Sequence, residues 1–347
     1  MTSLNMPLSD SHANLNGHEQ LSIPGLHAYW SRMMASLTGK GKGHNPEFHR
    51  DRLLLHVLGL GLEQTLHFLL QNHPDFDDFK AWIIATAGMP TDSVIARLQN
   101  LHLGTPLPPD ISDLFEQVDS MPDVFDKEDL QHWAEHGFVI LPNAVPPADC
   151  AMAAQTIWDA LGANEDDEAS WYHKGHANIM VQLFQSPAFE KNRRSLRIHK
   201  AFAQLWGTEN LWATTDRCSF NVPEKPGHIF QGPDLHWDVS LQQPVPFATQ
   251  GVLYLTDTPP EQGALTLVPG FHQRLGKWLD ELPENVCPRE QDLHALGSIP
   301  VGGKAGDLVI WHQALPHGSR PNRGKKPRIV QYINMLPSHL HIHENWR

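Results

Sequence analysis

Hydrophobic positions in the first third of the chain recur with the spacing of α-helices. Between residues 51 and 71, leucines and valines fall three and four positions apart, which predicts a helix that ends before Pro74. Residues 75–87 predict a second helix with an apolar face. Thr91 is a suitable N-cap for a third, and a short fourth helix fits residues 111–118.

These helices predict a small all-helical domain over residues 23–118. Residues 1–22 are polar and show no periodicity, so we expect a flexible tail. Residues 119–347 are expected to form a second, larger domain, because the pattern changes there.

The second part begins with a helix capped by Asp126, a short apolar strand over residues 137–141, and a helix over residues 147–161. Beyond residue 211, short apolar segments are separated by proline and glycine. They predict strands over residues 212–222, 235–241, 248–257, 264–268, 307–311 and 328–335. Regular spacing of this kind favours a sandwich or jelly-roll barrel.

Composition narrows the function classes. The 347 residues carry a net charge of −13, which disfavours binding to nucleic acid or to an anionic membrane. The start of the chain shows no basic-then-apolar segment, and about 18 consecutive apolar residues occur nowhere. The 3 cysteines are far apart and form no CxxC pair, so we expect a reduced, cytoplasmic protein.

The 23 histidines are the unusual number, because histidine is the commonest metal ligand. His236 and Asp238 stand two positions apart on a predicted strand, so their side chains leave the same face. His317 follows another predicted strand and could supply a third ligand. Two histidines and one carboxylate are typical of non-haem Fe(II) oxygenases, whereas structural zinc usually takes four protein ligands.

Arg328 adds a cation on the far side of a turn that contains Gly318, Pro321 and Gly324. A hairpin there would bring its guanidinium beside the metal, where it could bind the carboxylate of an iron-chelating co-substrate.

Together these segments resemble the phytanoyl-CoA dioxygenase family of Fe(II)/2-oxoglutarate-dependent oxygenases. The resemblance spans residues 125–336. Its motifs are Gly137-Phe-Val-Ile-Leu141, His236-x-Asp238, Gly263-Ala-Leu-Thr-Leu-Val-Pro-Gly-Phe-His272, Gly306-Asp-Leu-Val-Ile-Trp311, His317-Gly318-Ser319 and Pro327-Arg328.

The resemblance implies an α+β fold: a double-stranded β-helix, a jelly-roll or cupin-like core with flanking helices. It implies Fe(II) held by His236, Asp238 and His317, and 2-oxoglutarate held by Arg328 and Ser319. With O₂ as the oxidant, the co-substrate would leave as succinate and CO₂.

The expected reaction is hydroxylation of an unactivated C–H bond of a small molecule or natural-product intermediate, free or linked to a carrier or peptide. Asp238 disfavours halogenation, since related halogenases have a small residue at that position. Desaturation or ring closure stays open, as does a non-catalytic metal-binding jelly roll whose helical domain binds a partner. The sequence leaves the oligomeric state open.

Substrate contacts are expected from two loop-rich places. Asp216 and Arg217 precede a strand near the mouth of the barrel, and Trp171, His173 and His176 lie in a stretch that could close the site. We expect Trp237 to pack away from the metal.

Overall fold

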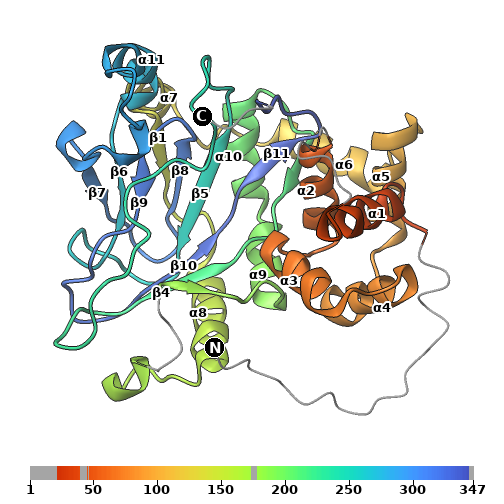
Figure 1. Ribbon diagram of the computed structural model, residues 1–347, viewed down its shortest axis with the longest axis horizontal. Helices are drawn as coiled ribbons and strands as arrows, with labels where there is room; N and C mark the ends of the chain where they lie inside the picture. The colour runs from red at the N-terminus through yellow and green to blue at the C-terminus, as the bar shows by residue number, and fades with distance from the viewer. Residues whose placement is uncertain (1–21, 40–44, 46, 173–177, 344–347) are drawn as a thin grey trace.

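The structure is a computed structural model, which describes residues 22–39, 45, 47–172 and 178–343. It combines helices and strands: the helices of the first 120 residues lie to one side of the sheets (Figure 1). The predicted tail over residues 1–22 falls almost entirely outside the described residues.

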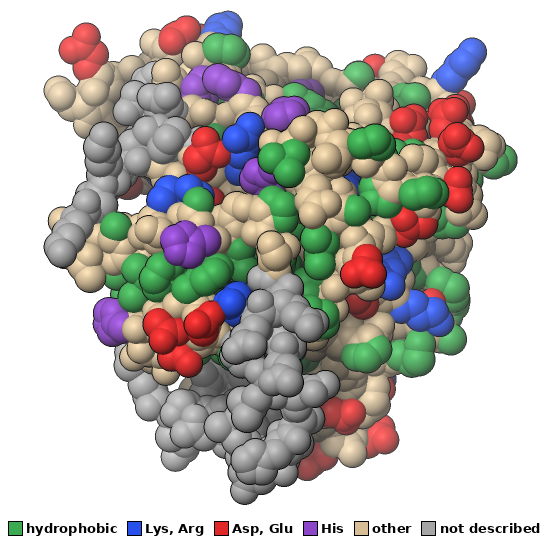
Figure 2. All heavy atoms as spheres, turned by 90° about the vertical axis from the view of Figure 1, so that its right-hand side faces the viewer, with side chains coloured by type: hydrophobic (Ala, Val, Ile, Leu, Met, Phe, Trp, Pro, Cys, Tyr) green, Lys and Arg blue, Asp and Glu red, His purple; other side chains and the backbone are tan. Residues whose placement is uncertain are grey.

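Six helices lie in the region predicted to be helical, before the helix that leads into the first strand. They are α1 Leu26–Leu37, α2 Phe48–Val57, α3 Leu62–Asn72, α4 Phe76–Ala87, α5 Asp92–Leu103 and α6 Pro109–Ser120. Figure 2 shows this side of the molecule, where hydrophobic side chains are interspersed with acidic, basic and histidine side chains.

The helix expected over residues 51–71 is two helices. Gly59 has a φ of 71°, which ends α2, and α3 starts after Gly61. A Cβ atom at Gly61 would overlap the ring of Phe184, so the absence of a side chain lets α3 approach the rest of the chain closely. The glycine at the start of α3 therefore allows this helix to pack against the segment that contains Phe184.

The helices share a core with the strand region. Trp212 of β3 (Leu211–Ala213) is buried in the same cluster as Leu26, Leu55 and Phe79. Arg97 lies over its indole ring at 3.6 Å and donates a hydrogen bond to the carbonyl of Leu211 (2.8 Å). The helices are thus packed directly onto β3.

The remaining elements follow in chain order. The helices are α7 Lys127–His136, α8 Pro147–Leu161, α9 Pro187–Arg193, α10 Leu196–Trp206 and α11 Phe271–Glu281. The strands are β1 Phe138–Leu141, β2 Met180–Val181, β3, β4 Cys218–Asn221, β5 Thr249–Tyr254, β6 Leu265–Leu267, β7 Ile299–Val301, β8 Leu308–His312, β9 His317–Gly318, β10 Arg328–Tyr332 and β11 Met335–Pro337.

Two antiparallel sheets organise these strands. The larger has the order β1-β8-β5-β10-β4-β2, and the smaller has the order β7-β6-β9; β3 and β11 form a separate pair. Neighbours in these sheets are far apart in sequence, so each sheet forms only when distant segments meet.

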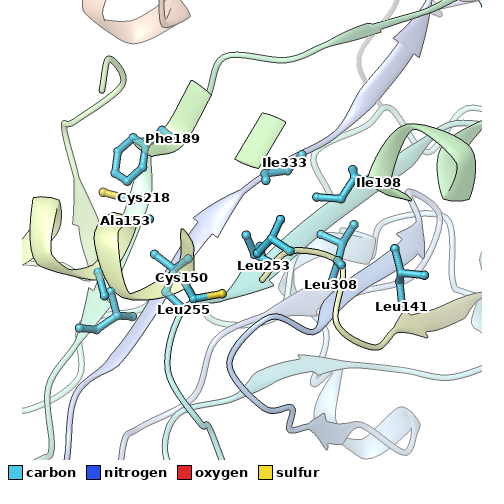
Figure 3. Packing of buried hydrophobic residues seen from close by; sticks show 14 of the residues in the cluster. Leu141, Cys150, Ala153, Phe189, Ile198, Cys218, Leu253, Leu255, Leu308 and Ile333 are labelled. Atoms are coloured by element: carbon cyan, nitrogen blue, oxygen red, sulfur yellow. The ribbon is translucent and has the colours of Figure 1, made fainter. Parts of the chain in front are cut away.

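Successive side chains of a strand point to opposite faces of the sheet, and the large sheet therefore has a hydrophobic layer on each face. In β8, Leu308 and Ile310 belong to the cluster formed with α8, α9 and α10, and Figure 3 shows Leu308 and Leu253 in that layer. Val309 and Trp311 belong to the opposite cluster, which includes residues of β6, β7 and α11. The large sheet is therefore covered by helices on one face and by the small sheet on the other.

Several predicted strands differ from the observed ones. Residues 212–222 form β3 and β4 with a break between them, and residues 328–335 form β10 and the start of β11. Residues 235–241 form no regular strand; only His236 makes an isolated bridge. Helices α1, α9, α10 and α11 were not predicted.

Among the described residues, no single helix has the length and apolarity to cross a membrane, although α2 and α3 taken together do, with a 97° bend between them.

Candidate metal and co-substrate site

His236 and His317 face each other across an antiparallel bridge. The backbone nitrogen of His236 donates to the carbonyl of His317 (2.9 Å), and the return bond is 3.0 Å. The two backbone segments can approach closely here because residue 318 is glycine: a Cβ atom at this position would clash with the carbonyl of Asp234. The bridge fixes the two imidazole rings 4.8 Å apart.

Hydrogen bonds orient both rings in the same way. Nδ1 of His236 donates to the carbonyl of Asp234 (2.6 Å), and Nδ1 of His317 donates to that of Leu315 (3.0 Å). Each Nε2 atom then faces the carboxylate of Asp238: that of His236 lies 3.4 Å from Oδ1, and that of His317 lies 3.2 Å from Oδ2. The three ligand atoms lie within 4.8 Å of one another.

Burial and charge act in opposite directions on these groups. The surrounding protein alone would raise the pKa of Asp238, but hydrogen bonds and charge from His236 and His317 outweigh it, so the pKa lies well below its usual range. Burial alone would lower the pKa of His236, but the hydrogen bond and the charge of Asp238 raise it. The carboxylate is therefore kept ionised at neutral pH.

Two side chains hold Asp238 in place. Gln250 of β5 donates from Nε2 to Oδ2 of Asp238 (2.7 Å) and accepts a hydrogen bond from the indole nitrogen of Trp311 (3.0 Å). Arg289 donates to the carbonyls of Trp237 (2.8 Å) and Val239 (2.6 Å), the residues on either side of Asp238. These contacts compensate for the lack of a regular strand.

Arg328 is a buried cation at the start of β10, with 2% of its surface exposed. Its Nη1 donates to Ser319 Oγ (3.0 Å) and to the carbonyl of Gly263 (2.9 Å), and its Nη2 donates to Ser219 Oγ (2.7 Å). The Nε atom is buried without a hydrogen-bond partner. No carboxylate among the described residues forms an ion pair with Arg328, so a bound anion would compensate a charge that the protein leaves uncompensated.

One cavity of about 500 Å³ connects these groups. His236, Asp238, His317, Ser319 and Arg328 all line it. Its size is within the usual range of small-molecule sites, about 300–1,000 Å³.

Of the residues predicted to contact the substrate, some line the cavity and others do not. Asp216 and Arg217 line the cavity. Trp171 is buried, donates to the carbonyl of Asn164 (2.7 Å) and lines a small neighbouring hollow instead. His173 and His176 lie outside the described residues. Trp237 packs against Phe271 and Trp278, away from the cavity, as expected.

Sequence reasoning missed Gln250, Ser219 and Arg52. The first two lie on strands whose register decides which side chains point inward, and Arg52 reaches the cavity from α2. The only local signal was a polar residue inside an apolar strand, as at Gln250 and Ser219.

The sequence model of the phytanoyl-CoA dioxygenase family matches residues 133–330, more than half of the chain. The protein belongs to this family of iron- and 2-oxoglutarate-dependent oxygenases.

Individual relatives are distant. A putative phytanoyl-CoA dioxygenase of Dictyostelium discoideum is 21% identical over 260 residues, covering 60% of this chain and 74% of the relative. The Ava biosynthesis cluster protein O of Aspergillus versicolor is 25% identical over 247 residues, covering 61% and 79%. An ectoine dioxygenase of Bordetella bronchiseptica is 24% identical over 238 residues, covering 61% and 75%.

Two similar solved structures come from an epimerase described as α-ketoglutarate-dependent and from a protein with 2-oxoglutarate bound. The epimerase SnoN from nogalamycin biosynthesis has a TM-score of 0.46 and 18% identity, covering 61% of this chain and 82% of SnoN. HygX from Streptomyces hygroscopicus, solved with nickel and 2-oxoglutarate bound, has a TM-score of 0.43 and 15% identity, covering 62% and 88%.

Proposed function

We propose that this protein hydroxylates an unactivated C–H bond of a small molecule, using Fe(II) held by His236, Asp238 and His317 and 2-oxoglutarate held by Arg328 and Ser319. The observation that carries the proposal is that both groups of residues line one cavity. The proposal includes a double-stranded β-helix as the fold of residues 119–347 and a helical N-terminal domain over residues 23–118.

The three proposed metal ligands suit iron. Two imidazole nitrogens and one carboxylate oxygen form a set that leaves further coordination positions open, as non-haem Fe(II) oxygenases require. The backbone carbonyls of Asp234 and Leu315 fix the tautomer in which each Nε2 can bind a cation. Asp238, with 56% of its side chain exposed, presents its carboxylate to the cavity.

Arg328 and Ser319 suit the distal carboxylate of 2-oxoglutarate. The guanidinium offers a planar pair of donors, and Ser319 Oγ lies beside it. Because the Arg328 side chain is buried, its position does not depend on the co-substrate. In this arrangement the keto acid end of 2-oxoglutarate lies toward the metal ligands.

Bound iron would supply the oxidising chemistry: O₂, 2-oxoglutarate and R–H give R–OH, succinate and CO₂. The protein's residues orient the reactants and keep Asp238 ionised. A carboxylate at position 238 also fills a metal position that a halide would need, which favours hydroxylation over halogenation. Desaturation or ring closure begins with removal of the same hydrogen, and product analysis separates these outcomes.

The proposed setting is cytoplasmic, because Cys150 and Cys218 are buried free thiols and no disulfide joins the described cysteines. The proposed substrate is a small molecule, since the cavity has the size of a small-molecule site.

Two measurements on the purified protein test the proposal. Anaerobic addition of Fe(II) and 2-oxoglutarate should produce a visible charge-transfer band, and aerobic incubation should release succinate even without substrate. His236→Ala and Asp238→Ala should abolish both. His339→Ala is the matched control, because His339 is exposed and lies outside the cavity.

Two results would contradict the proposal. A protein that binds metal but shows neither the band nor succinate is a non-catalytic metal-binding barrel. Full activity in either alanine variant would remove that residue from the metal site.

A further inference from the structure

Arg52 brings a cation from the N-terminal helices into the wall of the cavity. It lies on α2, and it lines both the cavity that holds the metal ligands and an adjoining hollow that extends to His56 and Glu63. Arg328 and Ser319 line only the first cavity. Arg52 is therefore on the helix side of Asp238, away from the proposed 2-oxoglutarate site.

The part of the cavity beside Arg52 and the part beside Arg328 lie at opposite ends of β10. Arg328 begins β10 and Tyr332 ends it, and the backbone of Tyr332 meets that of Arg217 (3.4 Å), which shares both hollows with Arg52. At about 3.3 Å per residue, the ends of this strand are about 13 Å apart. A small anion bound at Arg328 would not neutralise Arg52 as well.

The side chain of Arg52 has no directly contacting counter-ion among the described residues. Its guanidinium makes no ion pair or hydrogen bond there, its Nε atom is buried without a partner, and its nearest ring contact is Phe48 (5.8 Å). Neighbouring arginines differ: Arg217 pairs with Glu63 (2.6 Å) and Arg50 with Glu47 (3.2 Å).

Asp216 also lines the cavity and lies close enough for the charge of Arg52 to act on it, but the two side chains form no ion pair. Its Oδ1 accepts a hydrogen bond from the backbone nitrogen of Arg217 (2.8 Å), and no ion pair to Arg52 falls within 4.0 Å. A partly buried guanidinium that faces a cavity and forms no hydrogen bond or ion pair is suited to bind an anion.

We infer that Arg52 binds an anionic group of the substrate and that the substrate is a small organic acid. The inference rests on the proposed function, since it names the substrate class of the same cavity. It gives the N-terminal helices a role in substrate recognition, although they lie outside the segment that matches the family.

The test compares acids with their uncharged counterparts. Small carboxylic acids, the corresponding carboxamides and phosphonic acids are added to the enzyme with Fe(II), 2-oxoglutarate and O₂, and the rise in succinate release is measured. At least one acid should stimulate release, while its carboxamide should not. Stimulation by phosphonic acids instead would identify a phosphoryl group as the anion.

Arg52→Gln should then reduce the preference for the acid over its carboxamide, as a ratio of kcat/KM values, by about 10- to 100-fold, the range for lost charge-assisted hydrogen bonds. Arg52→Lys should retain part of it. Arg50→Gln is the matched control, because Arg50 is on the same helix but outside the cavity. A mere loss of folding would not change the ratio selectively.

The outcomes separate the two proposals. If the wild-type protein shows neither the anaerobic band nor succinate, the proposed function fails. If it shows both, but no acid stimulates turnover, or carboxamides serve equally well, or Arg52→Gln keeps the preference, the inference about Arg52 is wrong and the proposed function stands.

Discussion

Gln250 donates a 2.7 Å hydrogen bond to Oδ2 of Asp238, while its own oxygen accepts from Trp311. The amide thereby joins a proposed metal ligand to a core residue of β8. A metal ligand that a hydrogen-bond partner already holds in place loses less conformational entropy when the metal binds.

Gln250→Ala should weaken metal binding. Loss of a hydrogen bond to a metal ligand typically costs about 10–100-fold in affinity, and we expect a change of this size in a calorimetric Fe(II) titration under anaerobic conditions. Gln242→Ala is the control, because Gln242 is exposed near the same segment. Equal affinity in both variants would show that Asp238 is oriented by other contacts.

Arg328→Ala should mainly raise the KM for 2-oxoglutarate. Removing one partner of a buried charge pair costs about 2–5 kcal/mol, which corresponds to a rise of at least about 30-fold. Ser219→Ala, which removes one acceptor from Arg328, should have a smaller effect. Succinate release at varied 2-oxoglutarate concentrations measures both, and an unchanged KM in Arg328→Ala would exclude the proposed role.

The free energy of unfolding should decrease in mild acid because the buried ring of His56 is neutral in the folded protein. Burial lowers its pKa from 6.5 to about 3, and its Nδ1 accepts a hydrogen bond from the backbone of Thr215 (3.1 Å). Since the folded state favours the neutral ring, this stability is complete above pH 6.5 and is lost as the pH falls toward 3. The loss is about 1.4 kcal/mol per pH unit, or about 2 kcal/mol by pH 5.

Urea denaturation at pH 7 and pH 5 measures this dependence. His56→Gln should flatten it, whereas His67→Gln, which changes an exposed residue of α3, should leave it as in the wild type. The same slope in both variants would assign the acid sensitivity to other groups.

Trp212→Ala should destabilise the packing of the helices on β3. The residue is 5% exposed and lies in the core cluster of the helices, so the expected cost is about 3–5 kcal/mol of unfolding free energy. Trp212→Phe should cost less because most of the ring volume stays. Limited proteolysis should cleave the alanine variant between α1 and α5 first; unchanged protection would mean that the helices are held by other contacts.

Helices α4 to α8 were predictable because their signals are local. Asp126 caps α7 and Thr91 caps α5, as the sequence indicated. The break between α2 and α3 was not predicted: Gly59 adopts a φ of 71° there, and the close approach of Gly61 to the ring of Phe184, far away in the sequence, leaves no local signal.

The candidate site shows the same division. The convergence of His236, Asp238 and His317 could be predicted from their spacing and from the family resemblance, although residues 235–241 form no strand. Gln250 and Arg52 could not, because their positions depend on strand register and on where α2 packs. Neither property is encoded near those residues.

Trp212 also affects the order in which the chain can fold during synthesis. The helices α1 to α5 leave the ribosome well before β3, and domains generally fold as the chain emerges. Here the core of the helices is completed by a side chain that is still unsynthesised at that time. The apolar surface of the first helices that Trp212 covers therefore stays exposed to water until the start of the strand region has been synthesised.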